Sequence, residues 1–551
     1  MIEPGRWSVL SIILILTAAL LGLTTVADYG SSWDEQIRRE AGEQKLAYYQ
    51  HLFRGEFDQA REISSRKDKY PGFYDLNLAL LRRISPFSDV TTGHAFSLLL
   101  GVITVLGAVR LATLLGTTRA GFLAGLVLLL TPSFYGHMFI NPKDIPFAFG
   151  SVWSIYWIAR WLRDWPAPGW KTIGFTGLSI GITLACRIGG LVLICYLGLF
   201  ILLAWLAGAR QKEEQVRYSL KPLLRQILPV AVVVMAGLVI LAIYWPSMHA
   251  NPFARTGETL GAVTQFDWTM PIFFEGQFVP AQDLPWYYIL KMFLLKIPVG
   301  ILALLFAGAG FGIKAISQRE RLLPQPADLP RLLLWFAILF PLAYVIVRNS
   351  TLYNGIRHLL FLVPLIAVVA GMALDHILVL LSRTRKALRI TAVTGMAGYA
   401  LWIAVTCIRL HPYQYIYYNE LAGGIQQGSQ KYETDYWGTV YKELTEGLLR
   451  HLAEARPSFS HPYVVINMEH VTWLAQPYLP EESSLPIRLV RSQPDEDDYY
   501  MASTSWAANQ YHKGDPVVEV SRMGVRLGVV KDRRNLSEKE RAPVFQNEES
   551  E

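Results

Sequence analysis

The chain has 551 residues, of which 52% are hydrophobic and only 17% are charged, and its formal net charge is +7. Soluble globular proteins carry about 25% charged residues, so this composition excludes a disordered chain, a fibrous protein and an ordinary cytosolic enzyme. We expect a membrane protein with many spans and some additional soluble mass. The sequence has no CxxC or HExxH spacing and no GxxxxGK[ST] phosphate loop.

Apolar segments long enough to cross a bilayer begin at the N-terminus. The segment 7–27 is longer than a signal-peptide core, and we favour an uncleaved anchor over a cleavage site before Asp28. The pairs Gly121/Gly125 and Gly177/Gly181 have the GxxxG spacing of closely packed membrane helices. Including the first segment, about eleven spans are predicted, the others at 94–115, 119–138, 144–162, 172–186, 188–208, 227–246, 287–313, 332–348, 358–381 and 390–410.

The positions of the cations predict the orientation. With a cytoplasmic N-terminus and alternating spans, the short loops on the inner side are rich in Lys and Arg, as the positive-inside rule requires. The basic balance is therefore mainly a topology signal, and we expect no nucleic-acid partner. The outer side receives a long loop at 28–92, shorter loops near 141–144, 247–286 and 348–357, and everything after residue 410.

The part after the last span has a different pattern. A helix is predicted at 440–455, with short strands at 463–467, 487–490, 499–503 and 517–530. We therefore expect a transmembrane domain over 1–410 and a small outer α/β domain over 411–530. The charged segment 531–551 is poor in apolar residues and is predicted to be a disordered tail.

The first outer loop carries an acidic pair, Asp34 and Glu35, directly after Ser32. A structural interpretation is strong, because Ser32 and Glu35 have the spacing of a capping box and carboxylates are favoured in a first helical turn. A functional interpretation is a general base at the membrane surface, since a helix N-terminus keeps a carboxylate ionised. Local sequence leaves both open.

Charged residues recur at the outer ends of later spans. Lys143 and Asp144 follow Asn141-Pro142, which either starts the next helix or helps to bind a phosphate at its N-terminus. Arg187 lies between two apolar segments with almost no loop, where it either snorkels to headgroups or neutralises an anion. Since Arg357 and His358 repeat this placement, a lipid phosphate is the anion we expect on the outer face.

Two aromatic groups lie where an interfacial belt belongs, and sugar-stacking platforms would have the same sequence. Trp286 and Tyr287 begin one span, and tyrosines 413, 415, 417 and 418 follow the last one. Tyr436 and Trp437, just beyond, are either a structural turn or a contact for the acceptor or its sugar.

These residues, taken in order, resemble the C-type membrane glycosyltransferases (the GT-C superfamily). The resemblance covers roughly 7–410, with 93–161 the most specific stretch, and is to the bacterial relatives of the dolichyl-phosphate-mannose protein mannosyltransferases. These relatives include aminoarabinose transferases and RgtA/B/C/D-like proteins. The family's acidic pair matches Asp34 and Glu35, its middle basic residue, usually lysine, matches Arg187, and its late Arg-plus-ring motif matches Arg357-His358.

The resemblance implies an inverting transfer of a sugar from a polyprenyl-phosphate donor to an acceptor hydroxyl at the outer, periplasmic face of the cytoplasmic membrane. Asp34 would take the acceptor proton while Glu35 positions it. Lys143, Arg187 and Arg357 would neutralise the departing phosphate, with Asp144 and His358 completing its site. No cofactor is implied, and a divalent ion between Asp34 and Asp144 is compatible with the residues but not required.

Other function classes remain open. A transporter or flippase of lipid-linked sugars would place ionisable groups near the bilayer midplane and often shows inverted repeats, neither of which the sequence displays. An envelope scaffold would leave the outer-face charges without a role. Neither the sugar nor the acceptor, which could be a lipid, a glycan or a protein, follows from the sequence.

Overall fold

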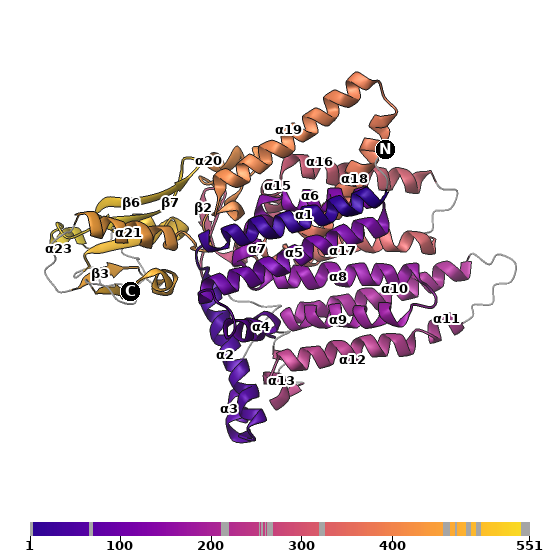
Figure 1. The fold of residues 1–551 in the computed structure, drawn as a ribbon, viewed down its shortest axis with the longest axis horizontal. Helices are drawn as coiled ribbons and strands as arrows, with labels where there is room; N and C mark the ends of the chain where they lie inside the picture. Colours follow the sequence, from indigo (N-terminus) through magenta and orange to yellow (C-terminus); the bar gives the residue numbers. More distant parts are fainter. Residues whose placement is uncertain are drawn as a thin grey trace.

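The computed structural model describes residues 4–65, 70–210, 220–252, 254, 257–258, 261, 268–318, 325–455, 463–468, 471–480, 486–491 and 497–541. Long helices lie side by side in a bundle, and a small sheet domain sits at one end of it (Figure 1). The first helix, α1 (Pro4–Thr25), begins at the far end of the bundle and runs toward the sheet. The fold is therefore mainly helical, as predicted.

Eight described helices are long and apolar enough to cross a membrane, or nine if one bent pair is a single span. The protein is thus a multi-pass membrane protein, with fewer candidate spans than the predicted eleven. Two of the predicted spans, now α8 (Asp144–Arg163) and α9 (Trp170–Cys186), are helices of the bundle but do not belong to these eight. The eight are α1, α5 (Asp89–Leu115), α10 (Leu191–Arg210), α12 (Ile227–Tyr244), α16 (Val299–Ser317), α17 (Leu329–Val347), α18 (Leu362–Ser382) and α19 (Lys386–Leu410), some with short flanking turns.

Two predicted spans are broken where a proline interrupts the helix. The helices α6 (Thr118–Leu129) and α7 (Pro132–Ile140) meet at an angle of 71°. The span predicted at 287–313 is α15 (Tyr288–Lys296) followed by α16, with Pro298 between them. Because proline lacks an N–H and restricts the residue before it, each break falls at an X-Pro step.

Glycines allow the helices to pack closely. A Cβ on Gly121 would lie 2.1 Å from the Thr113 side chain of α5, and one on Gly181 would lie 2.5 Å from Ile240 of α12. Separations this short are possible only for glycine, so both GxxxG pairs lie at helix–helix contacts. The helix α8 packs against α5, α9 and α17 and has a fully buried Trp161.

Short elements cover the end of the bundle nearest the sheet. The helix α2 (Trp33–Phe53) runs across this end rather than along the bundle axis and leads into α3 (Phe57–Ser65) and α4 (Phe73–Arg82) (Figure 1). The short helix α13 (Ser247–Ala250) packs against α3. A hairpin of β1 (Ile272–Phe274) and β2 (Gln277–Val279) lies between the bundle and the sheet. The predicted outer loops therefore gather at one end of the molecule.

The small domain contains a five-stranded mixed sheet of order β4-β3-β5-β7-β6. β3 pairs in parallel with β4 and β5, and the remaining pairs are antiparallel. The amphipathic α21 (Tyr441–Ala455) packs against β5, β6 and β7. The strands are β3 (Val464–Asn467), β4 (Ile487–Val490), β5 (Tyr499–Ser503), β6 (Asp515–Arg522) and β7 (Val525–Asp532).

Two predictions about this region are wrong in detail. The single strand expected at 517–530 is the β6–β7 hairpin, which turns at Met523-Gly524 with both residues at positive φ. The disordered tail expected from residue 531 is ordered through Arg541, because β7 continues to Asp532 and the fully buried Arg533 pairs with Asp497 at 2.8 Å. The rest of that tail, 542–551, lies outside the described residues.

The tyrosines after α19 do not form an interfacial belt. Tyr413 and Tyr415 are fully buried, and Tyr417 and Tyr418 nearly so. These rings pack in the core between the bundle and the sheet domain. The hydroxyl of Tyr415 donates a hydrogen bond to Asp435 there. The sequence could not distinguish this core from a belt, because both require aromatic residues with a polar tip.

Candidate active site

The N-terminus of α2 places Asp34 and Glu35 on different sides. Glu35 completes the predicted capping box, in which its carboxylate accepts the Ser32 N–H at 3.0 Å. The same carboxylate lies 3.0 Å from Nε2 of the buried His94, while the Ser32 hydroxyl donates to the Ile140 carbonyl at 2.7 Å. Glu35 therefore fixes the start of α2, and Asp34 is free to face the neighbouring chain segments.

The loop between α7 and α8 is held by one amide side chain. The Asn141 Oδ1 accepts the N–H groups of Lys143 and Asp144 at 3.2 and 2.8 Å, and its Nδ2 donates to the Asp144 carboxylate at 2.8 Å. On the other side, the Nδ2 lies 3.0 Å from His137 Nδ1, and Nε2 of that ring lies 3.1 Å from the Tyr436 hydroxyl. The turn residues predicted at the start of α8 thus orient a lysine and an aspartate together.

Five predicted charged residues meet in one cluster. The Asp34 carboxylate accepts from Lys143 Nζ at 3.0 Å and from Arg357 Nη2 at 2.9 Å. The Asp144 carboxylate pairs with Arg187 and lies 3.5 Å from Arg357 Nε. Because Arg357 reaches both carboxylates, the three cations and two anions form a single network, which we call the ion-pair cluster. They come from α2, the α7–α8 loop, the first turn of α8, the α9–α10 junction and the turn before α18.

Aromatic rings enclose one side of the ion-pair cluster. The Arg357 guanidinium lies 4.3 Å from the Trp437 ring and 5.3 Å from the Tyr353 ring. Tyr353 in turn stacks on Trp268 at 3.8 Å and meets the edge of His358 at 4.3 Å. Cation–π contacts of this kind favour a cation in a partly dry site, so these rings help to hold Arg357 in place.

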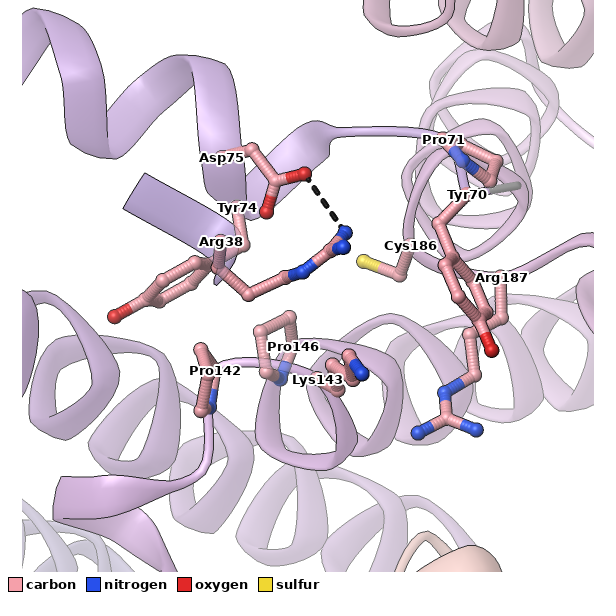
Figure 2. Close-up of a pocket in the computed structure, with 10 residues that line it drawn as sticks. All are labelled: Arg38, Tyr70, Pro71, Tyr74, Asp75, Pro142, Lys143, Pro146, Cys186 and Arg187. Carbon is pink, nitrogen blue, oxygen red and sulfur yellow. Dashed lines mark hydrogen bonds and ion pairs between the residues drawn. The ribbon is translucent and has the colours of Figure 1, made fainter. Parts of the chain in front are cut away.

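A second group of charges adjoins the cluster. Arg38 and Lys45 of α2 both pair with the buried Asp75 of α4, at 3.1 and 3.2 Å. Figure 2 shows Arg38, Lys143 and Arg187 around one small cavity, with Arg38 joined to Asp75. The cavity has a volume of about 10 Å³, enough for about one water molecule.

Sequence reasoning missed this second group. A signal existed, because Arg38 follows Asp34 by four residues and therefore shares its helix face. Asp75 had no such signal, since it comes from a separate helix that only the fold brings beside α2.

The electrostatics of the cluster keep Asp34 ionised. Burial by itself would raise the pKa of the Asp34 carboxyl, but Lys143 and Arg357 outweigh burial and hold this pKa well below its usual range. Burial lowers the pKa of the Lys143 ammonium, which Asp34 partly opposes. Burial and the neighbouring Arg357 lower the pKa of His358 to about 3, so this ring is neutral at physiological pH.

Not every predicted residue joins the cluster. His358 directly follows Arg357 and meets the edge of the Tyr353 ring, while the Tyr436 hydroxyl lies beside His137, which is joined to the cluster through Asn141. Trp286 is 65% exposed, and Tyr287 packs by Phe274 of the β1–β2 hairpin. Within the described ranges, no group of three or more His, Cys, Asp or Glu side chains could hold a metal ion.

Comparison with known proteins identifies the fold. No family model and no curated protein matches the sequence. Among solved structures, ArnT from Cupriavidus metallidurans bound to undecaprenyl phosphate matches with a TM-score of 0.51 and 14% identity, covering 96% of this chain and 98% of that chain. ArnT in the apo state matches over the same shares, with a TM-score of 0.51 and 13% identity. The chain has the GT-C fold.

A weaker match is the oligosaccharyltransferase AglB from Archaeoglobus fulgidus in complex with an inhibitory peptide and a dolichol-phosphate. Its TM-score is 0.47 at 12% identity, covering 96% of this chain and 75% of that chain. The predicted resemblance to GT-C enzymes is confirmed at the level of the fold by the two ArnT structures. At such low identity the function depends on the residues of this chain.

Proposed function

We propose that this protein is an inverting glycosyltransferase that moves a sugar from a polyprenyl-phosphate donor to an acceptor hydroxyl at the outer membrane surface. The observation that carries the proposal is the ion-pair cluster, in which Asp34, Lys143, Arg187 and Arg357 meet at one end of a GT-C bundle. That the structurally similar ArnT was solved bound to undecaprenyl phosphate supports a lipid phosphate as the ligand.

The chemistry assigns one role to each sign of charge. Asp34 accepts the proton of the acceptor hydroxyl as its oxygen attacks the anomeric carbon, while the bond from that carbon to the phosphate oxygen breaks. Lys143, Arg187 and Arg357 neutralise the charge that develops on the departing phosphate. The proton leaves Asp34 for water once the product has gone, which restores the carboxylate. Asp144 orients Arg187 and Arg357 rather than reacting itself.

The contacts also predict an order of binding. Without donor, Asp34 is bonded to two of the cations that the phosphate needs, and its lowered pKa makes it a weak base. A general base works best when its pKa lies near the operating pH. A bound phosphate competes for Lys143 and Arg357, which weakens their hold on Asp34 and raises its basicity. The donor therefore binds before the acceptor can react.

The topology proposed with this function has eleven spans. In addition to the eight candidate spans, it includes α8, α9 and the bent α6–α7 pair, which run beside them in the bundle (Figure 1). If all cross the cytoplasmic membrane with the N-terminus inside, the cluster and the sheet domain face the periplasm. This places the reacting sugar at the outer surface while the donor's lipid chain stays in the bilayer.

The proposal is tested with the purified protein in nanodiscs. Radiolabelled undecaprenyl phosphate should bind with an affinity that falls when Arg357 is changed to Ala. In cells lacking the gene, mass spectrometry of envelope lipids and glycans should show the loss of one sugar mass, restored by the wild-type gene. No binding of undecaprenyl phosphate, together with an unchanged set of envelope glycans, would refute the proposal.

A further inference from the structure

A second, much larger cavity lies where the bundle meets the sheet domain. Its volume is about 580 Å³, within the range of about 300–1,000 Å³ typical of small-ligand sites. Its walls are the β1–β2 hairpin, the segment 426–434 after α19, the turn of residues 504–510 and the β6–β7 turn. The hairpin and the sheet lie side by side at this junction in Figure 1.

The lining combines aromatic rings with uncharged polar groups. Four aromatic side chains, four amides and four hydroxyls make up most of it, together with one acid, Glu433, and one base, Arg526. Amides and hydroxyls both donate and accept hydrogen bonds, and ring faces pack against apolar C–H surfaces. A sugar presents these two surfaces together, hydroxyls at its edge and C–H groups on its face.

Two other ligand classes fit the lining poorly. A lipid chain would need aliphatic walls, but the aliphatic contribution is limited to Ala507 and Val525 among the lining residues. A phosphate would need free cations, but the single cation, Arg526, is paired with Glu519 at 2.7 Å. The chemistry therefore favours a neutral, hydroxyl-rich ligand.

Contacts link this cavity to the ion-pair cluster. Trp506, in the cavity wall, meets the edge of the Trp33 ring at 5.6 Å, and Trp33 directly precedes Asp34. The backbone N–H of Trp33 donates to the carbonyl of Trp437, whose ring lies against Arg357. Two tryptophan rings, Trp506 and Trp33, thus connect the cavity wall to the start of α2, where the proposed base lies.

The wall next to this link is held in a strained conformation. Trp506 and Ala507 have φ of +51° and +55°, a left-handed backbone that is unfavourable for non-glycine residues and is concentrated at functional sites. The Trp506 Nε1 donates to the Pro271 carbonyl at 3.0 Å, and the Ser505 hydroxyl donates to the Asp435 carbonyl at 2.7 Å. Both bonds fix the ring against the cavity.

Glu433 is suited to a sugar hydroxyl. Burial raises the pKa of its carboxyl to about 8, an effect that Lys296 and Arg357 partly oppose. A protonated carboxyl donates one hydrogen bond and accepts others, so at neutral pH this side chain can serve both sides of a hydroxyl.

We propose that this cavity binds the saccharide part of the acceptor, so that the acceptor of the transfer is a glycan or a glycolipid. The proposal rests on the proposed function, which supplies a reaction beside the cavity. The bound saccharide would present one hydroxyl past Trp506 toward Asp34, and the remaining rings would lie against the sheet domain. The sheet domain would then contribute to acceptor recognition.

The test uses the full-length protein in nanodiscs and saturation-transfer NMR. The probe is the pool of oligosaccharides released by mild acid from the envelope of cells lacking the gene. We expect the pool to bind, and Glu433→Ala and Gln430→Ala each to weaken binding by about fivefold or more, the loss of about one hydrogen bond. Glu433→Gln should retain binding, because an amide also donates and accepts.

Controls separate this proposal from the proposed function. Phe53→Ala, on an 84% exposed ring of α2, should leave saccharide binding unchanged. All these variants should bind undecaprenyl phosphate as the wild type does. The proposal is overturned if undecaprenyl phosphate binds but the saccharide pool does not, or if peptides from an envelope digest bind in its place. Gln430 is exposed at the rim of the cavity. If Gln430→Ala left saccharide binding unchanged, the proposal would also be overturned. Failure of undecaprenyl phosphate to bind would instead count against the proposed function.

Discussion

The replacement Asp34→Asn separates the two roles that the ion-pair cluster gives to this residue. Asparagine keeps the shape of the side chain but can neither accept a proton from the acceptor nor carry charge. Loss of a positioned general base lowers turnover by about 10²–10⁴-fold, or about 3–5 kcal/mol in activation free energy. We therefore expect turnover to fall by this factor.

The same change has a limited effect on stability. Lys143 loses its carboxylate partner, while Arg357 keeps Asp144 at 3.5 Å. Breaking a fully buried ion pair costs about 3–5 kcal/mol, but the side chains of Asp34 and Lys143 are 14% and 18% exposed. Solvent screening and the remaining amide oxygen reduce the cost to about 1–3 kcal/mol.

Asp34→Asn should lower turnover and stability, but it should not weaken donor binding. Because the asparagine no longer competes for Lys143 and Arg357, undecaprenyl phosphate should bind at least as tightly as to the wild type. The assay measures initial rates and donor affinity on the same nanodisc preparation, with thermal unfolding as a check of folding. A residue that only supported the structure would weaken binding and turnover together.

A matched control exists at the other end of the bundle. Asp375 pairs with Arg119 and accepts from the Thr117 hydroxyl at 3.1 Å. Asp375→Asn should destabilise the protein to a similar degree without changing turnover per folded molecule. If Asp34→Asn retained turnover within about tenfold of the wild type, well short of the loss expected for a general base, Asp34 could not be that base.

Three further changes test other parts of the structure. Arg187→Ala should weaken undecaprenyl phosphate binding by about tenfold, the loss of one charge-assisted contact, and leave the acceptor KM unchanged; an unchanged donor affinity would remove its assigned role. Glu35→Ala should lower the free energy of unfolding by about 1 kcal/mol through the lost α2 cap, and it should lower kcat less than Asp34→Asn does. Glu35→Gln should restore both stability and kcat, and failure of this variant to do so would contradict a positioning role. Arg533→Ala should lower the melting temperature and expose the sheet domain to protease, because the buried Asp497 loses its fully buried cation and keeps Arg541 and the Asn467 amide, each at 3.2 Å. Unchanged protease resistance would show that this pair is dispensable.

Much of the site could be predicted because its residues break local rules. Arg187 stands between two apolar segments, and Lys143-Asp144 stands at the start of a mostly buried helix, so each is costly unless it has a partner. Asp75 breaks no such rule, since an aspartate in a polar loop is unremarkable until α4 is packed against α2. The tyrosines after α19 show the reverse failure, in which a pattern typical of an interface is used to build a core.

The sequence alone determined the membrane class and the helices of the bundle, and it predicted that the charged residues share one side, because hydropathy and charge bias act locally along the chain. The tertiary structure decided which charges meet. Asp34 and Arg357 are separated by 323 positions, and no local preference encodes their contact. The large cavity beside Trp506 was likewise invisible in the sequence, because its walls come from four separate segments that only the packing of the sheet domain on the bundle brings together.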